Sequence, residues 1–254
     1  MQKRRKTPVQ LKTIEPQMCN TDLRLRILHG VSFFSALSHA QIEQINSQFH
    51  EKGITAGEYL YFAGDPAESL FIIAQGRVKL LRHTVAGREI MLDLLIPGEF
   101  FGTLSPEADS TYPDSTRAIT AGCVLQISRE QFRSILMQHP TVGMQILDIV
   151  AARLTAAHET IEQLSSQSAE VRIAATLVRL AAKLGEPHEV GLLIQTPLTR
   201  DELAEMTATT PETTSRVISH FQKDGWLTTG RQWIALKDLK ALQALAWQGI
   251  NLRD

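Results

Sequence analysis

The spacing of hydrophobic residues changes along the chain, and each change marks a different kind of segment. In residues 21–50, Leu23 and Ile27 belong to an apolar row at helical spacing, and Ser38 precedes HAQIEQINSQF as a helix N-cap. From 53 to 128, short β-rich runs such as SLFIIAQGRVKLLRH and STRAITAGCVLQIS are separated by glycine or proline. Many short strands with frequent turn signals predict a sandwich or a barrel.

The pattern returns to that of helices in residues 129–164. Ser128 caps the run REQFRSIL, and the run that follows Pro140 has no helix breaker except Gly143. Apolar residues recur there every seven positions in two rows, which are Leu147, Leu154 and Ile161, and Val150, Ala157 and Leu164. Such a seam predicts the pairing of two helices and so a dimer contact, with packing of the long helix on its own domain as the alternative.

The segments after this helix are shorter. The small polar stretch SSQSAE at 165–170 indicates a hinge, and VRIAATLVRLAAKLG predicts a helix that ends at Gly185. We expect EPHEVG to form a loop. The remaining residues predict a small α-rich unit with strand-like pieces around Trp226–Thr229 and Trp233–Leu236.

Residues 199–221 have the pattern of a helix-turn-helix. Thr199 and Glu202 match a capping box for a short first helix, and TATT makes the turn. Thr210 is suited to cap the second helix, and Pro211 is suited to its first position. The inward side of the second helix is expected to consist of Val217, Ile218 and Phe221.

The exposed first turns of this second helix carry Glu212, Ser215 and Arg216, which suit the major groove of DNA. Arginine can donate two hydrogen bonds to guanine, glutamate can accept one from cytosine N4, and serine can serve either role. Thr213 and the helix N-terminus could hold a phosphate. The alternative is an ordinary helix start, in which Glu212 favours the helix dipole and pairs with Arg216.

Composition restricts the choice of function. The 254 residues are 43% hydrophobic with a net charge of -1, so DNA binding would need a local patch. Only Cys19 and Cys123 occur, which argues against a disulfide framework and fits a reducing cytosol. The chain has no run of ~18 apolar residues, so no membrane span is expected. Residues 1–20 predict a disordered basic tail. Without a Gly-rich phosphate loop, a metal-spaced His/Cys set or a nucleophile elbow, we expect no enzyme.

In their order along the chain, these pieces resemble the CRP/FNR superfamily of bacterial transcription regulators. The resemblance covers roughly residues 21–240 and rests on GDPAESLFIIAQGRVKLLR, IPGEFFG, the long helix and LTRDELAEMTATTPETTSRVISHFQKDGWL. It implies an α+β fold with a cyclic-nucleotide-binding-type β-roll (jelly roll), a long dimerisation helix and a C-terminal winged helix-turn-helix. The expected parts are a disordered tail (1–20), an effector-sensing β-roll domain with flanking helices (21–138), a dimerisation helix and hinge (139–168), and a winged helix-turn-helix DNA-binding domain (169–254).

Within that superfamily, PETTSR is similar to the FNR-type recognition pattern Glu-x-x-Ser-Arg. The cyclic-AMP receptor type has an arginine where this chain has Pro211 and a glycine where it has Ser215. The resemblance implies a cytoplasmic homodimer on double-stranded DNA, at an inverted repeat of TTGAT-like half-sites, with RNA polymerase as a further partner. The residues expected at the DNA are Glu212, Ser215, Arg216, Thr213, Thr210 and Thr199.

The resemblance also implies an effector pocket in the β-roll, which we expect to include Gly102, Thr103, Leu104, Tyr112, Arg117 and His158. Cyclic-AMP members have a glutamate directly after the last glycine of the IPGEFFG motif, for the ribose, and an arginine–serine pair for the phosphate. This chain has Thr103 in the first place, and Tyr112 and Pro113 in the second. The loop 103–116 holds no Lys or Arg but three acidic residues, so a cyclic phosphate would meet uncompensated negative charge. We therefore expect no cyclic AMP.

Other effectors stay open. The oxygen-sensing members hold an iron–sulfur cluster with four cysteines, and the two cysteines here argue against one. Haem remains a candidate, because His158 matches the place where cyclic-AMP members touch their ligand from the long helix; an exposed helix histidine is the alternative. A haem-based gas or redox sensor, a small-molecule effector and control by abundance without an effector are the remaining alternatives.

Overall fold

The computed structural model describes residues 19–85, 87, 89–103, 109–196 and 198–247. The chain divides into two compact units, and the border between them falls between Leu154 and Thr155. We call them the N-terminal unit and the C-terminal unit. Of the predicted tail, residues 1–20, only Cys19 and Asn20 lie within the described residues.

The N-terminal unit starts with short helices. These are α1 (Thr21–Gly30), the 3-10 turn η1 (Ser32–Phe34) and α2 (His39–Asn46). Asn20 caps α1 through its side chain, and Ser38 forms a capping box with Gln41 at the start of α2. The predicted N-cap at Ser38 is confirmed.

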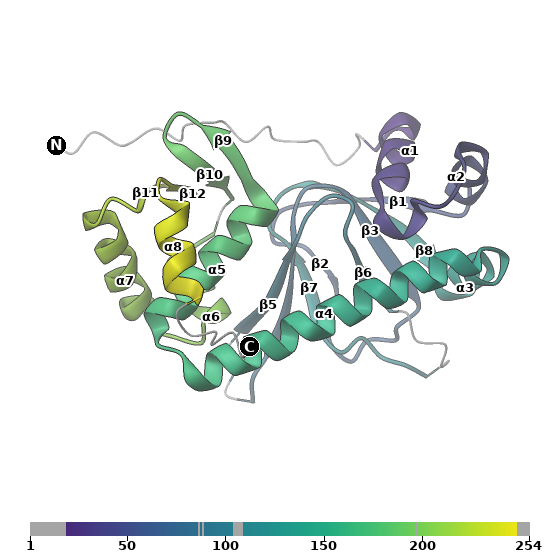
Figure 1. Ribbon diagram of the computed structural model, residues 1–254. Coiled ribbons are helices and arrows are strands. Elements are labelled where there is room, and N and C mark those ends of the chain that lie inside the picture. Colours follow the sequence, from purple (N-terminus) through teal and green to yellow (C-terminus); the bar gives the residue numbers. More distant parts are fainter. Residues whose placement is uncertain (1–18, 86, 88, 104–108, 197, 248–254) are drawn as a thin grey trace, which may run out of the picture. The chain divides into compact units, whose positions relative to one another are not determined.

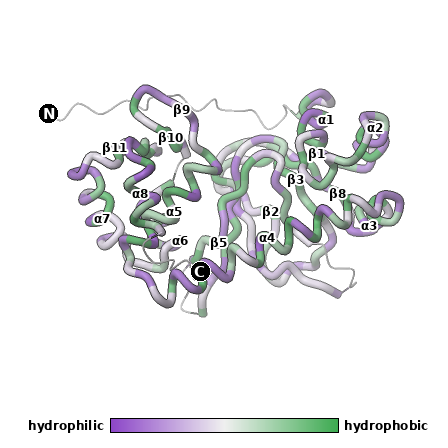
Figure 2. The backbone as a smooth tube through the Cα atoms, viewed as in Figure 1, coloured by the Kyte–Doolittle hydropathy of each residue, from purple (hydrophilic) through white to green (hydrophobic). Residues whose placement is uncertain are grey.

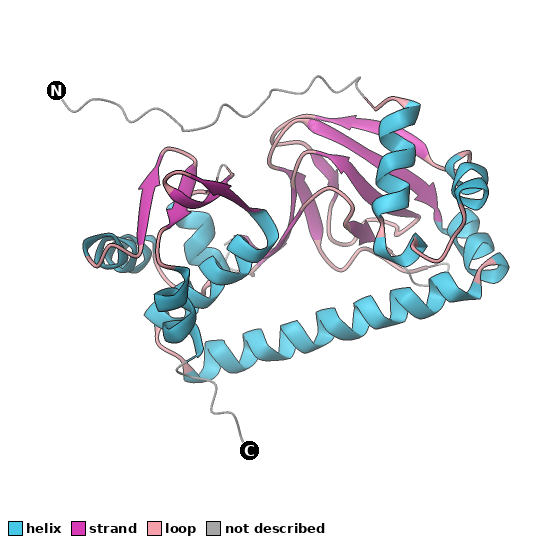
Figure 3. Cartoon of the chain, turned by 45° about the horizontal axis from the view of Figure 1, so that its top comes forward, coloured by secondary structure: helices cyan, strands magenta, loops and turns pink. Residues whose placement is uncertain are grey.

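The strands that follow form two four-stranded sheets in which every pairing is antiparallel. The first sheet has the order β1 (His50–Ile54), β8 (Gly122–Ser128), β3 (Ser69–Gln75) and β6 (Phe100–Gly102). The second has the order β2 (Tyr59–Tyr61), β7 (Ser115–Ala118), β4 (Val78–His83) and β5 (Glu89–Leu95). Figure 3 draws these strands in magenta. The sandwich or barrel that the sequence predicts is therefore a two-sheet β-roll.

Both faces of β3 are buried, and this strand accordingly carries a nearly unbroken hydrophobic run (Figure 2). Side chains alternate between the faces of a strand. Leu70 and Ile72 pack in one layer with the N-terminal helices, including Phe33. Phe71 and Ile73 pack in a second layer with residues of the other sheet. We call the second layer, between the two sheets, the inner layer.

Cys19 and Cys123 form a disulfide bond, with their Cα atoms 6.2 Å apart and 104 positions between them in sequence. Both side chains are buried in the layer between the helices and the first sheet. The sequence argues against a disulfide framework, and this single bond between the only two cysteines is not part of that expectation. Cysteines so far apart in the chain become neighbours only through the fold, and the count of two carries no information on that distance.

Two helices complete this part of the chain, α3 (Arg129–Gln138) and α4 (Pro140–Ser166). Ser128 forms a capping box with Gln131 at the start of α3, as its position in the sequence predicts. The 27 residues of α4 run past Gly143 without interruption. This helix crosses the border between the two units.

The C-terminal unit combines helices with a small antiparallel sheet (Figure 1). Its elements after α4 are α5 (Ala169–Leu184), β9 (Gly185–His188), β10 (Gly191–Gln195), α6 (Arg200–Met206), α7 (Pro211–Lys223), β11 (Leu227–Gly230), β12 (Trp233–Leu236) and α8 (Leu239–Trp247). The sheet order is β11, β12, β10 and β9. The two predicted strand pieces are confirmed as β11 and β12, which form the wing.

The expectation of a loop at EPHEVG is wrong, because residues 186–188 belong to β9 and pair with β10. Pro187 lacks an N–H and suggests a loop in the sequence. However, β9 lies at the edge of the sheet, where a strand tolerates proline. Among the described helices, none is both long and apolar enough to cross a membrane.

Candidate functional site

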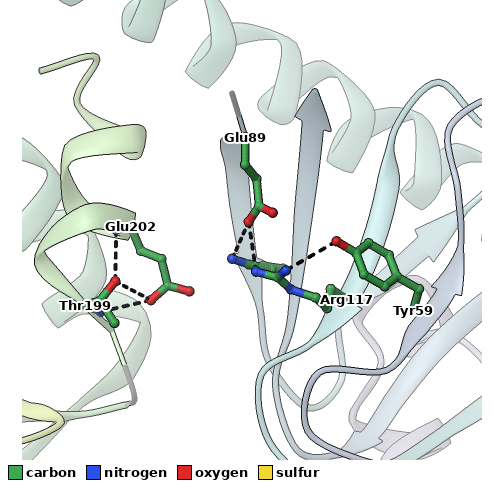
Figure 4. A network of polar contacts seen from close by, with 6 residues as sticks. Tyr59, Glu89, Arg117, Thr199 and Glu202 are labelled. Atoms are coloured by element: carbon green, nitrogen blue, oxygen red, sulfur yellow. Dashed lines mark hydrogen bonds and ion pairs between the residues drawn. The ribbon is translucent and has the colours of Figure 1, made fainter. Parts of the chain in front are cut away.

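Both helices of the helix-turn-helix begin with the predicted caps. The backbone N–H of Glu202 donates to Thr199 Oγ1 at 3.1 Å, and the N–H of Thr199 donates to Glu202 Oε2 at 2.9 Å (Figure 4). At the start of α7, the N–H of Thr213 donates to Thr210 Oγ1 at 3.2 Å, and Pro211 is the first helical residue. These bonds fix the residue at which each helix starts.

The turn between α6 and α7 is tight. Thr207 is buried, and its hydroxyl donates to the carbonyl oxygen of Leu203 at 2.7 Å. Ala208 has φ 46°, in the left-handed region that residues with a Cβ rarely adopt. The chain reverses here within four residues, as the TATT segment predicts.

The sides of α7 differ in exposure. Val217, Ile218 and Phe221 are buried, as expected. Glu212, Ser215 and Arg216 are exposed and fall at spacings of three and four, so they share one face of the helix. The alternative ion pair between Glu212 and Arg216 does not form between these two described residues. The structure thus brings the three predicted DNA-contacting residues together, while their contact with bases stays a prediction.

Glu212 is held in its ionised form. Its own backbone N–H, together with the Thr210 hydroxyl, lowers the pKa of the Glu212 carboxyl. An ionised carboxylate only accepts hydrogen bonds. At neutral pH this side chain is therefore suited to a donor such as the cytosine amino group.

Beside Arg216 lies an open hollow of about 590 Å³. It is lined by the start of α5 and by α7, including Glu170, Arg216, His220 and Lys223. His220 Nδ1 lies 2.8 Å from Glu170 Oε1 and so links the two helices. Arg216 and Lys223 therefore lie on the wall of this hollow, together with the first turn of α5.

The predicted seam of α4 faces solvent. Of its six residues, the five large ones (Leu147, Val150, Leu154, Ile161 and Leu164) are 41–61% exposed, and Ala157 is exposed as well. Packing of the whole seam on its own domain, the alternative, would bury these side chains. A row of exposed leucine, isoleucine and valine at heptad spacing matches a surface that pairs with a second helix.

The inner layer of the β-roll is filled with aromatic rings. Tyr112 is only 5% exposed and stacks on Tyr61 with ring centroids 3.6 Å apart. Phe71 and Phe101 stack beside them, 5.1 Å apart. The Tyr112 hydroxyl donates to the Ser69 carbonyl oxygen at 3.1 Å and accepts from the Ser69 N–H at 3.1 Å. Tyr112 is thus a packed and fully hydrogen-bonded part of the core.

Three of the expected pocket residues meet around Ser69. The N–H of Thr103 donates to the same Ser69 carbonyl oxygen at 3.2 Å. Gly102 has φ 102°, and a Cβ on it would lie 2.5 Å from that oxygen, so glycine is required there. Leu104 lies outside the described residues.

Arg117 does not join this cluster. Its neighbour Ala118 belongs to the inner layer, so Arg117 lies on the opposite face of β7. There its guanidinium donates to Glu89 Oε1 at 2.9 Å and to the Tyr59 hydroxyl at 3.3 Å (Figure 4). The remaining expected pocket residue, His158, is exposed on the part of α4 that belongs to the C-terminal unit.

The sequence did not point to Tyr61 or Asp114 as members of the β-roll interior. The Tyr61 hydroxyl donates to Asp114 Oδ1 at 3.3 Å. Burial raises the pKa of Asp114, and burial with the nearby Asp114 charge raises that of Tyr61. Alternation along β2 would put Tyr61 on the same face as Tyr59, but the register of β2 against β7 shifts between these two residues, and Tyr61 packs in the inner layer beside Tyr112.

Two protein-family models match the chain. The model of the cyclic nucleotide-binding domain matches residues 51–139, from β1 to the end of α3. The model of the Crp-like helix-turn-helix domain matches residues 171–245, from α5 into α8. Fold and surface therefore define a two-part protein, with a sensor-type β-roll and a DNA-binding helix-turn-helix.

Curated relatives agree with this class. The CRP-like cAMP-activated global transcriptional regulator of Mycobacterium tuberculosis is 26% identical over 216 residues, which are 85% of this chain and 96% of the relative. The transcriptional activator protein anr of Pseudomonas aeruginosa is 29% identical over 190 residues, 75% of this chain and 78% of the relative. The chain belongs to the CRP/FNR superfamily of DNA-binding transcription regulators.

Solved structures show the same fold. FixK2 from Bradyrhizobium japonicum superposes with a TM-score of 0.70 at 22% identity, over 78% of this chain and 96% of that one. A CooA mutant from Carboxydothermus hydrogenoformans gives a TM-score of 0.67 at 23% identity, over 79% and 88%. These likenesses establish the architecture, and the effector has to be argued from this chain's own residues.

Proposed function

We propose that this regulator binds an inverted repeat of TTGAT-like half-sites as a homodimer. The observation that carries the proposal is the exposed set Glu212, Ser215 and Arg216 on one face of α7, whose other side is buried. Arginine suits the guanine of such a half-site, and glutamate suits a cytosine on the opposite strand. Thr199, Thr210 and Thr213 lie at the N-termini of α6 and α7, where backbone N–H groups can hold phosphates.

The α4 seam supports the homodimer. An inverted repeat presents two half-sites about one helical turn, ~34 Å, apart, and each requires its own recognition helix. A single chain offers one α7. Pairing through Leu147, Leu154 and Ile161, with the interleaved second row, would bury side chains that are exposed in the single chain.

The β-roll of this chain does not suit a cyclic nucleotide. The Mycobacterium tuberculosis relative is cAMP-activated by its name, and cyclic-AMP members hold the phosphate with an arginine–serine pair. Tyr112 stands at the arginine position and is stacked and hydrogen-bonded within the core. Arg117 lies on the other face of its strand. A phosphate at this place would meet the acid Asp114, and the nearby Arg82 is exposed and donates to the Pro113 carbonyl oxygen.

Two cofactors of the superfamily also lack support in these residues. An iron–sulfur cluster needs cysteine thiolates, and Cys19 and Cys123 are bonded to each other. No group of three or more His, Cys, Asp or Glu suited to a metal is present in the described part of the chain. His158, the haem candidate, is exposed. We propose control by a small organic effector or by the abundance of the protein.

A gel-shift titration tests the DNA-binding proposal. Wild-type protein should bind a duplex with an inverted TTGAT repeat at least about a thousandfold more tightly than a shuffled duplex. Cyclic AMP, added at millimolar concentration, should leave this affinity unchanged. Equal affinity for the two duplexes would refute sequence-specific recognition, and a cyclic-AMP-dependent gain in affinity would refute the proposal for the roll.

Arg216→Ala separates recognition from general DNA affinity. The variant should lose ~1–3 kcal/mol at the intact site and discriminate less at one base pair of each half-site. Arg179, an exposed arginine on α5, provides the matched control, because Arg179→Ala removes the same charge elsewhere in the unit. If Arg216→Ala keeps the wild-type ratio between the intact and the shuffled duplex, Arg216 does not contact a base.

A further inference from the structure

One side chain, Arg172 in the first turns of α5, joins three backbone carbonyl groups from two places in the C-terminal unit. Its Nη1 donates to the carbonyl oxygen of Gln167 at 2.7 Å. Its Nε donates to the carbonyl oxygen of Thr207 at 2.9 Å, and its Nη2 donates to that of Ala208 at 3.3 Å. Gln167 directly follows α4, and Thr207 and Ala208 form the turn between α6 and α7.

These three carbonyl groups lie at the C-terminal ends of helices. The last carbonyl groups of a helix have no partner within it and carry the negative end of the helix dipole. Arg172 therefore places one cation at the C-terminal ends of both α4 and α6. In α5 itself the arginine lies near the N-terminus, where a positive charge is unfavourable. Its hydrogen bonds to the C-terminal ends of the other two helices offset this unfavourable interaction with the dipole of α5.

The three acceptors require the fork of a guanidinium. Arginine presents five N–H donors in one rigid plane, whereas lysine has a single ammonium on a flexible chain. A lysine here could keep the charge but could not reach the hinge and the turn together. The bonds to the turn also fall on Ala208, whose φ of 46° is uncommon for alanine. Arg172 thus helps to hold a backbone conformation that the sequence does not favour by itself.

On its other side, the first turn of α5 contacts the recognition helix directly. Glu170 Oε1 lies 2.8 Å from His220 Nδ1 of α7, and His220 Nε2 lies 3.4 Å from Asp224 Oδ2. The start of α5 therefore contacts the turn before α7 through Arg172 and the last turn of α7 through Glu170. Only Gln167 and Ser168 separate α4 from α5.

From this arrangement we propose that Arg172 is a positioning residue, which fixes the direction of α7 relative to the end of α4. In a dimer joined through α4, that direction sets the distance between the two recognition helices. The proposal rests on the proposed function, a homodimer on an inverted repeat. It adds that the spacing preference depends on a residue that contacts no base.

The test compares half-sites with full sites. The probes are a duplex with a single TTGAT half-site and a set of inverted repeats whose central spacer varies by one or two base pairs in either direction. Wild-type protein should prefer one spacer sharply. Arg172→Met should bind the half-site as wild type does, within about twofold, but lose about tenfold at the best full site, with a flatter dependence on the spacer. Arg172→Lys should resemble Arg172→Met.

The half-site measurement distinguishes positioning from folding. If Arg172 merely stabilised the unit, affinity for the half-site and for every full site would fall by the same factor, and that result would overturn the proposal. Full rescue by Arg172→Lys would overturn it as well, because the fork would then be unnecessary. Arg179→Met serves as the control for loss of an arginine from α5 and should match wild type on all probes. Failure of the proposed function looks different, since wild-type protein would then show no preference for any TTGAT duplex.

Discussion

Reduction of the Cys19–Cys123 bond should destabilise the N-terminal unit selectively. A cross-link restricts the unfolded chain, and the entropy it removes grows with the length of the closed loop. With a sequence separation of 104, that relation gives about 16 cal/mol/K, or about 4.7 kcal/mol at 25 °C. Domains are stable by only ~5–15 kcal/mol, so the bond contributes a large share. With a urea dependence of ~2 kcal/mol/M, the midpoint of unfolding should fall by about 2 M.

The distribution of aromatic residues makes the measurement specific. The three tyrosines, Tyr59, Tyr61 and Tyr112, belong to the N-terminal unit, and the three tryptophans, Trp226, Trp233 and Trp247, belong to the C-terminal unit. Near-ultraviolet circular dichroism of the tyrosines in urea, with and without dithiothreitol, should show the shift. Tryptophan fluorescence should show the same midpoint in both conditions.

A double variant supplies the control. Cys19→Ser with Cys123→Ser removes the bond permanently, so its tyrosine transition should lie near that of the reduced protein and should not respond to dithiothreitol. If the wild-type tyrosine transition has one midpoint with and without reductant, the loop-entropy argument fails. An equal shift of the tryptophan signal would show that the effect is not confined to the N-terminal unit.

Three further predictions concern single side chains. Leu154→Glu puts a charge into the α4 seam and should give monomers in sedimentation velocity; a variant that stays dimeric would place the dimer contact elsewhere. Because burial raises the pKa of Asp114, its ionisation costs stability once the pH passes the ordinary carboxyl pKa, and the full cost is reached above the raised pKa. Asp114→Asn should therefore melt higher than wild type at pH 7, with a difference that shrinks as the pH falls from the raised pKa toward the ordinary value of ~4. A lower melting temperature for Asp114→Asn at pH 7 would contradict this sign. Thr210→Ala removes the cap of α7 and should cost ~1 kcal/mol in the tryptophan-monitored transition, whereas Thr209→Ala, one residue earlier, should cost less.

Much of the fold is specified by residues close together in the sequence. The caps at Ser38, Ser128, Thr199 and Thr210 depend on a side chain and a backbone group three positions apart, and all four form as predicted. The seam of α4 depends on a seven-residue period within one helix. The shared face of Glu212, Ser215 and Arg216 likewise follows from helical spacing alone.

The interior of the β-roll was less predictable, because strand pairing joins residues far apart. Tyr61 and Tyr112 stack on each other although they are far apart in sequence, and the backbone of Ser69 holds the Tyr112 hydroxyl. Arg117 was expected in the pocket, but the alternation of β7 turns it to the opposite face. One position along a strand decides that outcome, and the motif that suggested the pocket does not specify it.

The sequence by itself thus determined the superfamily, the succession of elements and the residues on the exposed face of α7. These depend on helical periods and on caps, in which residues that are close in the sequence are also close in space. Only the tertiary structure decided the Cys19–Cys123 bond, the filled interior around Tyr112 and the contacts of Arg172 with two helix ends. Each of these joins groups that are distant in sequence or that lie on the backbone, where the identity of the side chain gives no signal.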